Sequence, residues 1–304
     1  MEGIVLFYKP KEITSYEVVR KFKELVNENH IGHGGTLDPL AEGLLILGIG
    51  RKATKRLSRI LKNTEKEYEA VVKLGAVSET YDAEGPIVEQ KILSIPTYEE
   101  IKDKLKIFIG EIYQTPPLYS AVKIKGKPAY ERIRKGEKIE LKPKKVFIKS
   151  IEILGYESLK VQLRIIANSG VYIRSLAHDL GQVLGCGAYL YDLKRTRINS
   201  FNIEKAISFK DLENDFIELK GEIFGKVQGV GFRFFALKEA KKLDLKGYVS
   251  NTEKGSVEVL AQGKEKSLQE FIKKLKKGPL FAQVNDFDFI FQKPTTKFSS
   301  FFVL

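Results

Sequence analysis

Asp38 is the first residue whose type and setting suggest chemistry. It stands in the stretch IGHGGTLDPLAEGLLILGIGRKATKRL (31–57), after glycines at positions 32, 34 and 35 and directly before a proline. Glycines permit backbone conformations closed to other residues, and Asp-Pro commonly marks a turn, so the stretch predicts a tight turn. Either Asp38 is an ordinary turn residue, or the turn presents its carboxylate to a polynucleotide. Four basic residues just downstream could then meet phosphates: Arg51, Lys52, Lys55 and Arg56.

A second feature is the basic run KIKGKPAYERIRKGEKIELKPKK (123–145). It holds ten Lys or Arg against three Glu. Lysines this dense are often a solvated face. The tyrosines at 119 and 130 favour RNA contact instead, because aromatic rings stack on bases while lysines hold the backbone. We expect substrate contacts from Lys123, Lys125 and Lys127.

The overall composition narrows the class of protein. The chain has 304 residues, a formal net charge of +13 and 43% hydrophobic residues, which fits two domains and suggests a polyanionic partner. It contains no run of eighteen apolar residues, so we expect a cytoplasmic protein without a membrane span. A single cysteine, Cys186, excludes an internal disulfide and a thiolate metal cluster, and three histidines make a metal site unexpected. Protein partners and oligomeric state are not indicated.

The elements that must position these residues follow an α+β pattern. Alternating segments such as KEYEAVVKLG (66–75) predict strands, and residues 172–185 place apolar side chains at helical spacing. From residue 218 the predicted order is strand, helix, strand, strand, helix, strand, the βαββαβ outline of a ferredoxin-like sandwich. We therefore predict a mixed-sheet domain over residues 1–216 and a small domain over 217–304, the latter with 16 basic and 10 acidic residues.

Four segments of the first domain resemble the TruB family of tRNA pseudouridine synthases. They are GHGGTLDPLAEGLL, KEYEAVVKLGAVSETYDAEGPI, QTPPLYSAVKIKGKPAYERIRKG and GVYIRSLAHDLGQVLGCGAYLYDLKRTR, in family order over residues 1 to about 212. One departure is Gly34, where the family more often has Thr. The resemblance implies isomerisation of a T-loop uridine of tRNA, at RNA position 55, to pseudouridine, with the T-arm as partner.

The resemblance also implies roles for individual residues. Asp38 is the expected catalytic carboxylate, Tyr68 stacks on the target uracil, and Arg174 is the partner of Asp38. His33 occupies the space of the flipped base, and substrate contacts are implied for Thr36 and Leu193. An arginine beside a carboxylate lowers its pKa and keeps it ionised in a pocket. The reaction moves one glycosidic bond without oxidation or group transfer, so no cofactor or metal is expected.

Each residue also has a plainer interpretation. Tyr68 in a strand is by default a cross-strand or core aromatic, and Arg174 at a helix start is normally solvated. A protein that binds RNA with an inactive synthase site is the alternative at the level of the whole domain. The four motifs in order favour the enzyme.

The segment from about Leu219 to Leu304 resembles acylphosphatase along its whole length. GKVQGVGFRFFALKEAKKLDLKGYVSNTEKGSVEVLAQG carries most of this resemblance, which implies a ferredoxin-like fold with Arg233 and Asn251 in the site. The loop from Gln228 through Gly229, Val230 and Gly231 to Phe232 runs into a helix, whose N–H groups can cradle an anion. Arg233 could grip a phosphoryl group, and Asn251 could orient the attacking water.

The two activities leave alternatives open. The second domain is expected to hydrolyse acyl phosphates, or else it is a catalytically inert, RNA-binding appendage, because a fold does not fix a function. A further alternative makes acylphosphatase the main activity and the first domain its RNA tether. The physiological acyl phosphate, and any coupling between the domains, cannot be inferred from the sequence.

Overall fold

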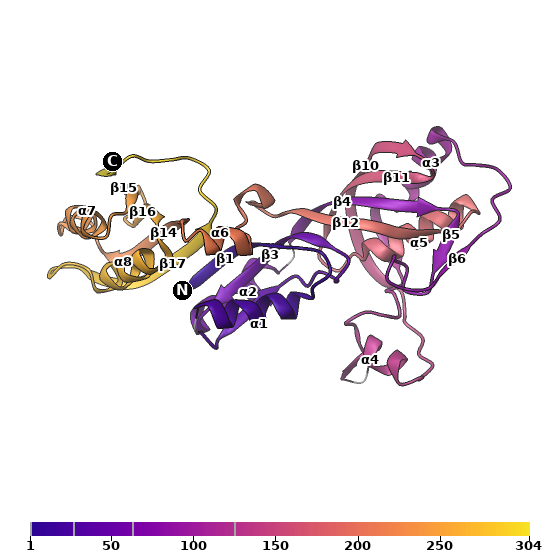
Figure 1. The fold of residues 1–304 in the computed structure, drawn as a ribbon, viewed down its shortest axis with the longest axis horizontal. Helices are drawn as coiled ribbons and strands as arrows, with labels where there is room; N and C mark the ends of the chain where they lie inside the picture. The colour runs from indigo at the N-terminus through magenta and orange to yellow at the C-terminus, as the bar shows by residue number, and fades with distance from the viewer. Residues whose placement is uncertain (1, 27, 63, 125) are drawn as a thin grey trace. The chain divides into compact units, whose positions relative to one another are not determined.

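The structure is a computed structural model that describes residues 2–26, 28–62, 64–124 and 126–304. It divides into two compact units (Figure 1). Unit 1 comprises Met1–Asp38, Gly43–Leu61 and Phe201–Leu304, and unit 2 comprises Pro39–Glu42 and Lys62–Ser200. The boundary expected near residue 216 stays a prediction. None of the helices in the described ranges is long and apolar enough to cross a membrane.

Unit 1 combines the first elements of the chain with the whole of the small βαββαβ module. The elements before residue 62 are β1 (Gly3–Lys9), α1 (Ser15–Val26), β2 (Ile31–Gly34), β3 (Glu42–Ile49) and α2 (Arg51–Ile60). A connecting stretch holds β13 (Phe201–Asn202), the 3-10 turn η2 (Ile203–Lys205) and α6 (Phe209–Glu213). The module consists of β14 (Ile217–Lys226), α7 (Phe232–Lys242), β15 (Lys246–Asn251), β16 (Val257–Gly263), α8 (Glu265–Lys277) and β17 (Gln283–Gln292).

The predicted βαββαβ order is confirmed, and the structure adds one strand. β18 (Phe301–Val303) pairs parallel with β15 at the outer edge, so the strands run β18-β15-β16-β14-β17. This strand is not evident from the sequence, because three residues are too few to show an alternating pattern.

Strand β1 extends the sheet of the module. It pairs parallel with β17, with Ile4 opposite Ile290 and Val5 opposite Phe291, while β3 pairs antiparallel on its other side. The same hydrophobic core contains Phe7 and Phe22 together with Phe271 and Phe289. Segments almost 290 residues apart in the sequence therefore fold as one sheet over one core.

The sequence predicted that the glycines before Asp38 form a tight turn, and this prediction is wrong for two of them. Gly32 and Gly34 lie in β2, paired with β3, and only Gly35 adopts a positive φ, of 69°. Gly34 is buried, and a Cβ there would overlap the side chain of Leu61. The glycine at this departure from the family pattern thus lets α2 and the residue after it lie close to β2.

Unit 2 is built on a fully antiparallel sheet in the order β12-β4-β11-β10-β7. Its strands are β4 (Glu65–Leu74), β7 (Gly110–Gln114), β10 (Lys144–Glu157), β11 (Lys160–Asn168) and β12 (Ala188–Ile198). Two small hairpins accompany it, β5 (Ala76–Ser78) with β6 (Ile87–Glu89) and β8 (Lys123–Ile124) with β9 (Lys127–Pro128). The helical elements are α3 (Tyr98–Leu105), η1 (Lys106–Phe108), α4 (Ala129–Arg134) and α5 (Ile173–Leu184).

Helix α5 packs against the sheet and is fixed at its start. Ile173, Leu176 and Leu180 are buried at the predicted helical spacing. At its start, the Gln114 side chain accepts a hydrogen bond from the backbone N–H of Tyr172 (2.8 Å) and donates one to its carbonyl oxygen (3.0 Å). These bonds fix the direction in which the first turn of α5 projects its side chains.

Candidate functional site

Asp38 ends a short loop that is fixed from two sides. The hydroxyl of Ser15, the first residue of α1, accepts a hydrogen bond from the backbone N–H of Leu37 and donates to its carbonyl oxygen, both at 3.0 Å. The His33 Nε2 lies 3.2 Å from the hydroxyl of Thr36, with which it shares a hydrogen bond. Asp38 itself is half-buried.

Two of the four basic residues predicted to meet phosphates have carboxylate partners in the module. Arg56 forms an ion pair with Asp288, and Lys52 lies 3.5 Å from Asp286. Both carboxylates belong to β17, which lies beside β1 in the sheet. The pairing of β1 with β17, which the sequence does not show, thus gives these two side chains carboxylate partners.

In unit 2, Tyr68 is anchored by a buried arginine. It lies on β4 directly opposite Arg195 of β12, and the Arg195 guanidinium donates a hydrogen bond to its phenolic oxygen. Both are buried, with Tyr68 8% and Arg195 1% exposed. Burial lowers the pKa of Arg195, and the contact with Tyr68 opposes that shift. The ring that is predicted to stack on uracil is therefore fixed in orientation by its own hydroxyl.

Lys66 adds a second basic group, on the same strand as Tyr68. Burial, together with repulsion by Arg195, lowers the pKa of Lys66 to about 8. Residues two apart in a strand project to the same face, so Lys66 and Tyr68 share one side of β4. The surroundings of Tyr68 therefore carry positive charge, which favours an anionic substrate group.

Arg174 occupies the first turn of α5 and has a carboxylate partner within unit 2. Its Nη1 lies 3.2 Å from Oδ2 of Asp82, and both side chains are buried. The guanidinium also donates to the backbone oxygens of Thr80 (3.3 Å) and Tyr119 (3.1 Å). A guanidinium held at this many points is a rigid charge rather than a solvated side chain.

Pairing of Arg174 with Asp38 concerns residues of different units, and it stays a prediction. Asp82 and Arg195 are functional candidates that the sequence analysis missed. Asp82 stands inside the quoted segment KEYEAVVKLGAVSETYDAEGPI, and Arg195 inside YLYDLKRTR. For Arg195 the available signal was a charged residue within strand-forming sequence, where a charge is rarely buried without a partner. The polar sequence around Asp82 carries no such signal.

The remaining predicted substrate contacts of the first domain differ in how exposed they are. Leu193 is buried on β12, and Thr36 is exposed. Lys123 and Lys127 are exposed on the β8–β9 hairpin, as a phosphate-binding role requires. Lys125 lies outside the described residues.

The glycine loop of the module has the shape that the sequence predicted. Gly229 and Gly231 adopt positive φ values of 72° and 76°, and a Cβ at either would meet open space, so conformation rather than crowding selects glycine. Gly231 is the N-cap of α7 and has no side chain with which to cap it. The first N–H groups of α7 therefore point into an open, glycine-lined turn suited to an anion.

The side chains around this loop have separate tasks. Gln228 donates to the backbone oxygens of Thr252 (2.9 Å) and Ser256 (2.8 Å), which ties the loop to the β15–β16 turn. The Phe232 side chain is buried in the core, so any contact it makes with substrate comes from its backbone. Val230 is likewise packed against that core.

Arg233 and Asn251 lie on adjoining elements of the module. Arg233 is half-buried in the first turn of α7, and its Nη1 donates to the backbone oxygen of Leu304 at 3.0 Å. Asn251 is exposed at the end of β15. β15 of the sheet packs against α7, so the two residues lie on elements that are in contact.

Sequence comparison connects this geometry with known proteins. Residues 23–173 match the TruB family pseudouridylate synthase N-terminal domain, and residues 174–226 match the tRNA pseudouridylate synthase B C-terminal domain. A protein from Chlamydia abortus called tRNA pseudouridine synthase B is 46% identical over 206 residues, which are 68% of this chain and 86% of that protein. The chain belongs to the TruB family of pseudouridylate synthases. A relative of the same name from Aquifex aeolicus is 45% identical over 219 residues, covering 69% of this chain and 73% of its own.

The TruB part is followed by an acylphosphatase domain, matched over residues 219–303. Among solved structures, a chain of a Cbf5-Nop10-Gar1 complex has a similar fold, with a TM-score of 0.55 and 24% identity, covering 94% of this chain and 84% of that one. The TruB family motifs contain Asp38, Tyr68 and Arg174, and the acylphosphatase domain contains the glycine loop, Arg233 and Asn251.

Proposed function

We propose that the chain isomerises a T-loop uridine of tRNA, at position 55, to pseudouridine, with Asp38 as the catalytic carboxylate. The observation that carries this proposal is the 46% identity over 206 residues to a tRNA pseudouridine synthase B. Physical support comes from the anchored ring of Tyr68 and from the fixed charge of Arg174, which we propose as the partner of Asp38. Because tRNA is the substrate, we propose the cytoplasm as the location.

The reaction places few demands on the protein. The bond between ribose C1′ and N1 breaks, the uracil turns, C1′ joins C5, and the hydrogen of C5 is lost while N1 gains one, so the base is an isomer of the original. Asp38 acts at the sugar or the base, and Tyr68 holds the detached ring by stacking. The nucleotide first leaves its stack, which costs a few kcal/mol and is cheapest in a loop.

Tritium release tests this proposal directly. A tRNA transcript labelled with tritium at C5 of uridine loses the label when C5 becomes the glycosidic carbon. We expect release by the full chain without added cofactor, and none above background by Asp38→Asn, which keeps the shape but removes the charge. Asp103→Asn, on the exposed surface of α3, is the matched control and should act like the parent chain. Release by Asp38→Asn at the parent rate would overturn the assignment.

We further propose that the acylphosphatase domain is active and hydrolyses an acyl phosphate to a carboxylate and inorganic phosphate. The observation that carries this is the loop of Gly229 and Gly231, which opens the N-terminus of α7 beside Arg233. Water adds to phosphorus while the carboxylate leaves with the bonding electrons. A carboxylate is stable as an anion, so it departs without a general acid.

Hydrolysis of benzoyl phosphate by the full chain in the presence of EDTA tests this second activity. We expect turnover and competitive inhibition by inorganic phosphate, which occupies the same loop. Absence of hydrolysis by a chain that still modifies tRNA would instead favour the catalytically inert, RNA-binding appendage.

A further inference from the structure

The two helices of the acylphosphatase domain carry lysines on their outer sides. On α7, Lys238, Lys241 and Lys242 are exposed at a spacing that places them along one side of the helix. On α8, Lys266, Lys273 and Lys277 recur at intervals of seven and four, again along one side, and are exposed, with Lys274 half-buried next to them. We call these seven residues the basic helical face: Lys238, Lys241, Lys242, Lys266, Lys273, Lys274 and Lys277.

Helices α7 and α8 pack against each other, and their two rows of lysines surround one buried carboxylate. Glu239 of α7 is buried and accepts a hydrogen bond from Lys242 at 2.5 Å. That bond lowers the pKa of Glu239, and the charges of Lys274 on α8 and Lys238 on α7 lower it further. Lysines of both helices therefore act on the same carboxylate, and one negative charge is shared among several positive ones.

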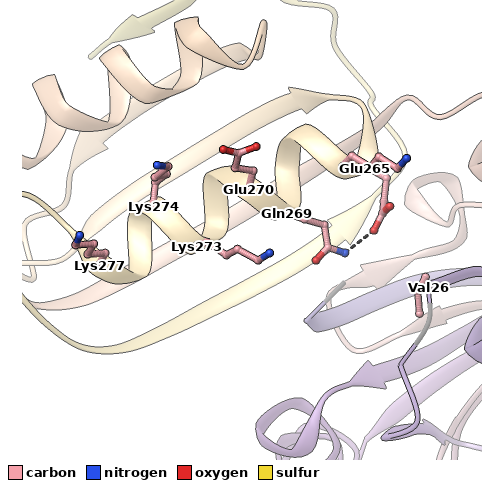
Figure 2. Close-up of a pocket in the computed structure, with 8 residues that line it drawn as sticks. Val26, Glu265, Gln269, Glu270, Lys273, Lys274 and Lys277 are labelled. Atoms are coloured by element: carbon pink, nitrogen blue, oxygen red, sulfur yellow. Dashed lines mark hydrogen bonds between the residues drawn. The ribbon is translucent and has the colours of Figure 1, made fainter.

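The α8 side of this surface is hollowed. A groove of about 620 Å³ runs along α8, with Val26 of α1 on its far side. Four lysines and two glutamates line it together with Gln269, so its lining keeps a net positive charge: Lys266, Lys273, Lys274, Lys277, Glu265 and Glu270. Figure 2 shows Lys273 and Lys274 projecting to different sides of the helix, with Glu270 beside Lys274 and Lys277 further along. Glu265 accepts a hydrogen bond from Gln269, so its charge is partly engaged within the helix.

The face of the sheet away from these helices carries carboxylates that already have basic partners: Asp288 pairs with Arg56, and Glu258 lies 3.9 Å from Lys220. Glu222 of β14 stands directly opposite Glu258 of β16 on one side and Asp288 of β17 on the other. Residues 217, 219, 223, 257 and 259, which alternate with these, are in the core, so the three carboxylates project from the other face. RNA-binding domains of similar fold often stack bases on their open sheet, and a row of carboxylates opposes that mode.

An exposed aromatic ring extends the basic row. Phe234 is 71% exposed and lies one helical turn before Lys238 on α7. Lysines that hold phosphates beside a ring that stacks on a base are the combination found in proteins that bind single-stranded nucleic acid.

We propose that the basic helical face binds the phosphate backbone of RNA, and that the acylphosphatase domain thereby contributes to holding the tRNA on which the synthase acts. The identity of the RNA rests on the proposed function, whereas the binding surface rests on charge complementarity. The domain then combines an anion-binding loop at the start of α7 with an RNA-binding surface along its helices.

The test uses the full chain and a tRNA transcript as the probe. The triple variant Lys266→Gln, Lys273→Gln, Lys277→Gln removes three charges from the face. The control triple Lys102→Gln, Lys104→Gln, Lys106→Gln removes the same charge from exposed positions on α3 and η1 of unit 2. Circular dichroism verifies that both variants are folded.

Each phosphate contact contributes roughly 0.7 to 0.9 to the slope of log Kd against log salt concentration. We therefore expect the slope of the first triple to fall by about 2 and its affinity at low salt to fall at least tenfold. The control should bind within about twofold of the parent. A parental slope in the first triple, or an equal loss in both triples, would overturn the proposal. Lysine-dependent binding to anionic vesicles without any change in tRNA binding would overturn it in favour of a membrane surface.

Binding is measured without turnover, so it is independent of the proposed isomerisation. A chain that fails to release tritium but shows the changed slope leaves this inference standing. If the parent chain isomerises uridine but the lysine triple keeps the parental slope of log Kd against log salt concentration, this inference is wrong.

Discussion

Tyr68 and Arg195 stand directly opposite each other on β4 and β12, and the buried guanidinium of Arg195 donates a hydrogen bond to the phenolic oxygen of Tyr68. The ring that would stack on the substrate is thereby part of the hydrogen bonding of the core. One side chain would thus serve stability through its hydroxyl and substrate contact through its ring.

Tyr68→Phe separates these two contributions. It keeps the stacking surface but takes one acceptor from a buried charged donor, so we expect the free energy of unfolding to fall by about 1 to 3 kcal/mol. Urea denaturation should show a lower midpoint with an unchanged m value. Tyr156→Phe is the comparison, because its hydroxyl donates to the backbone of Pro96 and belongs to neither site. A midpoint for Tyr68→Phe equal to that of the parent would contradict the anchoring role.

Asp82→Asn should be far more destabilising than loss of an exposed ion pair. The Arg174–Asp82 pair is buried, so neutralising one partner leaves a buried charge and costs about 3 to 5 kcal/mol. Glu152→Gln breaks the Arg164–Glu152 pair, whose atoms lie 2.9 Å apart at the surface, and should cost less than about 1 kcal/mol. Urea midpoints of the two variants measure the difference. Equal losses of unfolding free energy in Asp82→Asn and Glu152→Gln would contradict the expectation that burial makes the Arg174–Asp82 pair more costly to break.

Arg233→Ala and Asn251→Ala should impair acyl phosphate hydrolysis in different ways. Arg233 would stabilise the oxygens of the transferred phosphoryl group, so its loss should abolish both inhibition by phosphate and turnover. Asn251 would place the water, so its loss should reduce turnover by about 100-fold or more while phosphate still binds. Asn285→Ala, an exposed amide on β17, is the matched control. Loss of phosphate binding in Asn251→Ala would show that the two roles are not separate.

The ionisation of Asp179 should make the free energy of unfolding depend on pH. Burial raises the pKa of Asp179 from 3.8 to about 6. The folded chain then binds a proton more tightly than the unfolded chain, so the contribution of this group to stability decreases as pH rises from about 4 to 6. The change in the free energy of unfolding caused by Asp179→Asn should therefore be more favourable at pH 7 than at pH 4.

Urea midpoints of Asp179→Asn at several pH values test that expectation, with Asp103→Asn as an exposed comparison whose effect should vary less with pH. A stabilisation of Asp179→Asn that is the same at pH 4 and pH 7 would contradict it. The neighbouring Tyr81 titrates well above this range, because burial and the charge of Asp179 raise the pKa of its phenol.

The sequence predicted the order of elements in the module and the helix that holds Arg174, because both depend on local periodicity and glycine conformation. It did not predict that Arg174 would face Asp82, or Tyr68 face Arg195. Those contacts join residues 92 and 127 positions apart, and they are decided by strand register and helix placement, which no local pattern specifies. The need for glycine at position 34 was also not predictable, because it comes from the side chain of Leu61, which a Cβ there would overlap.

The parallel pairing of β1 with β17 has a consequence for the order of folding. Val5 is opposite Phe291, so one edge of β1 has no partner until almost the whole chain has been made. At usual rates of synthesis this interval is about 15 to 60 s, far longer than hairpin formation takes. During that time an apolar strand is paired with β3 on one edge only, and such unpaired edges promote aggregation. In a nascent chain, the second edge of β1 is therefore open to pairing with other strands for tens of seconds.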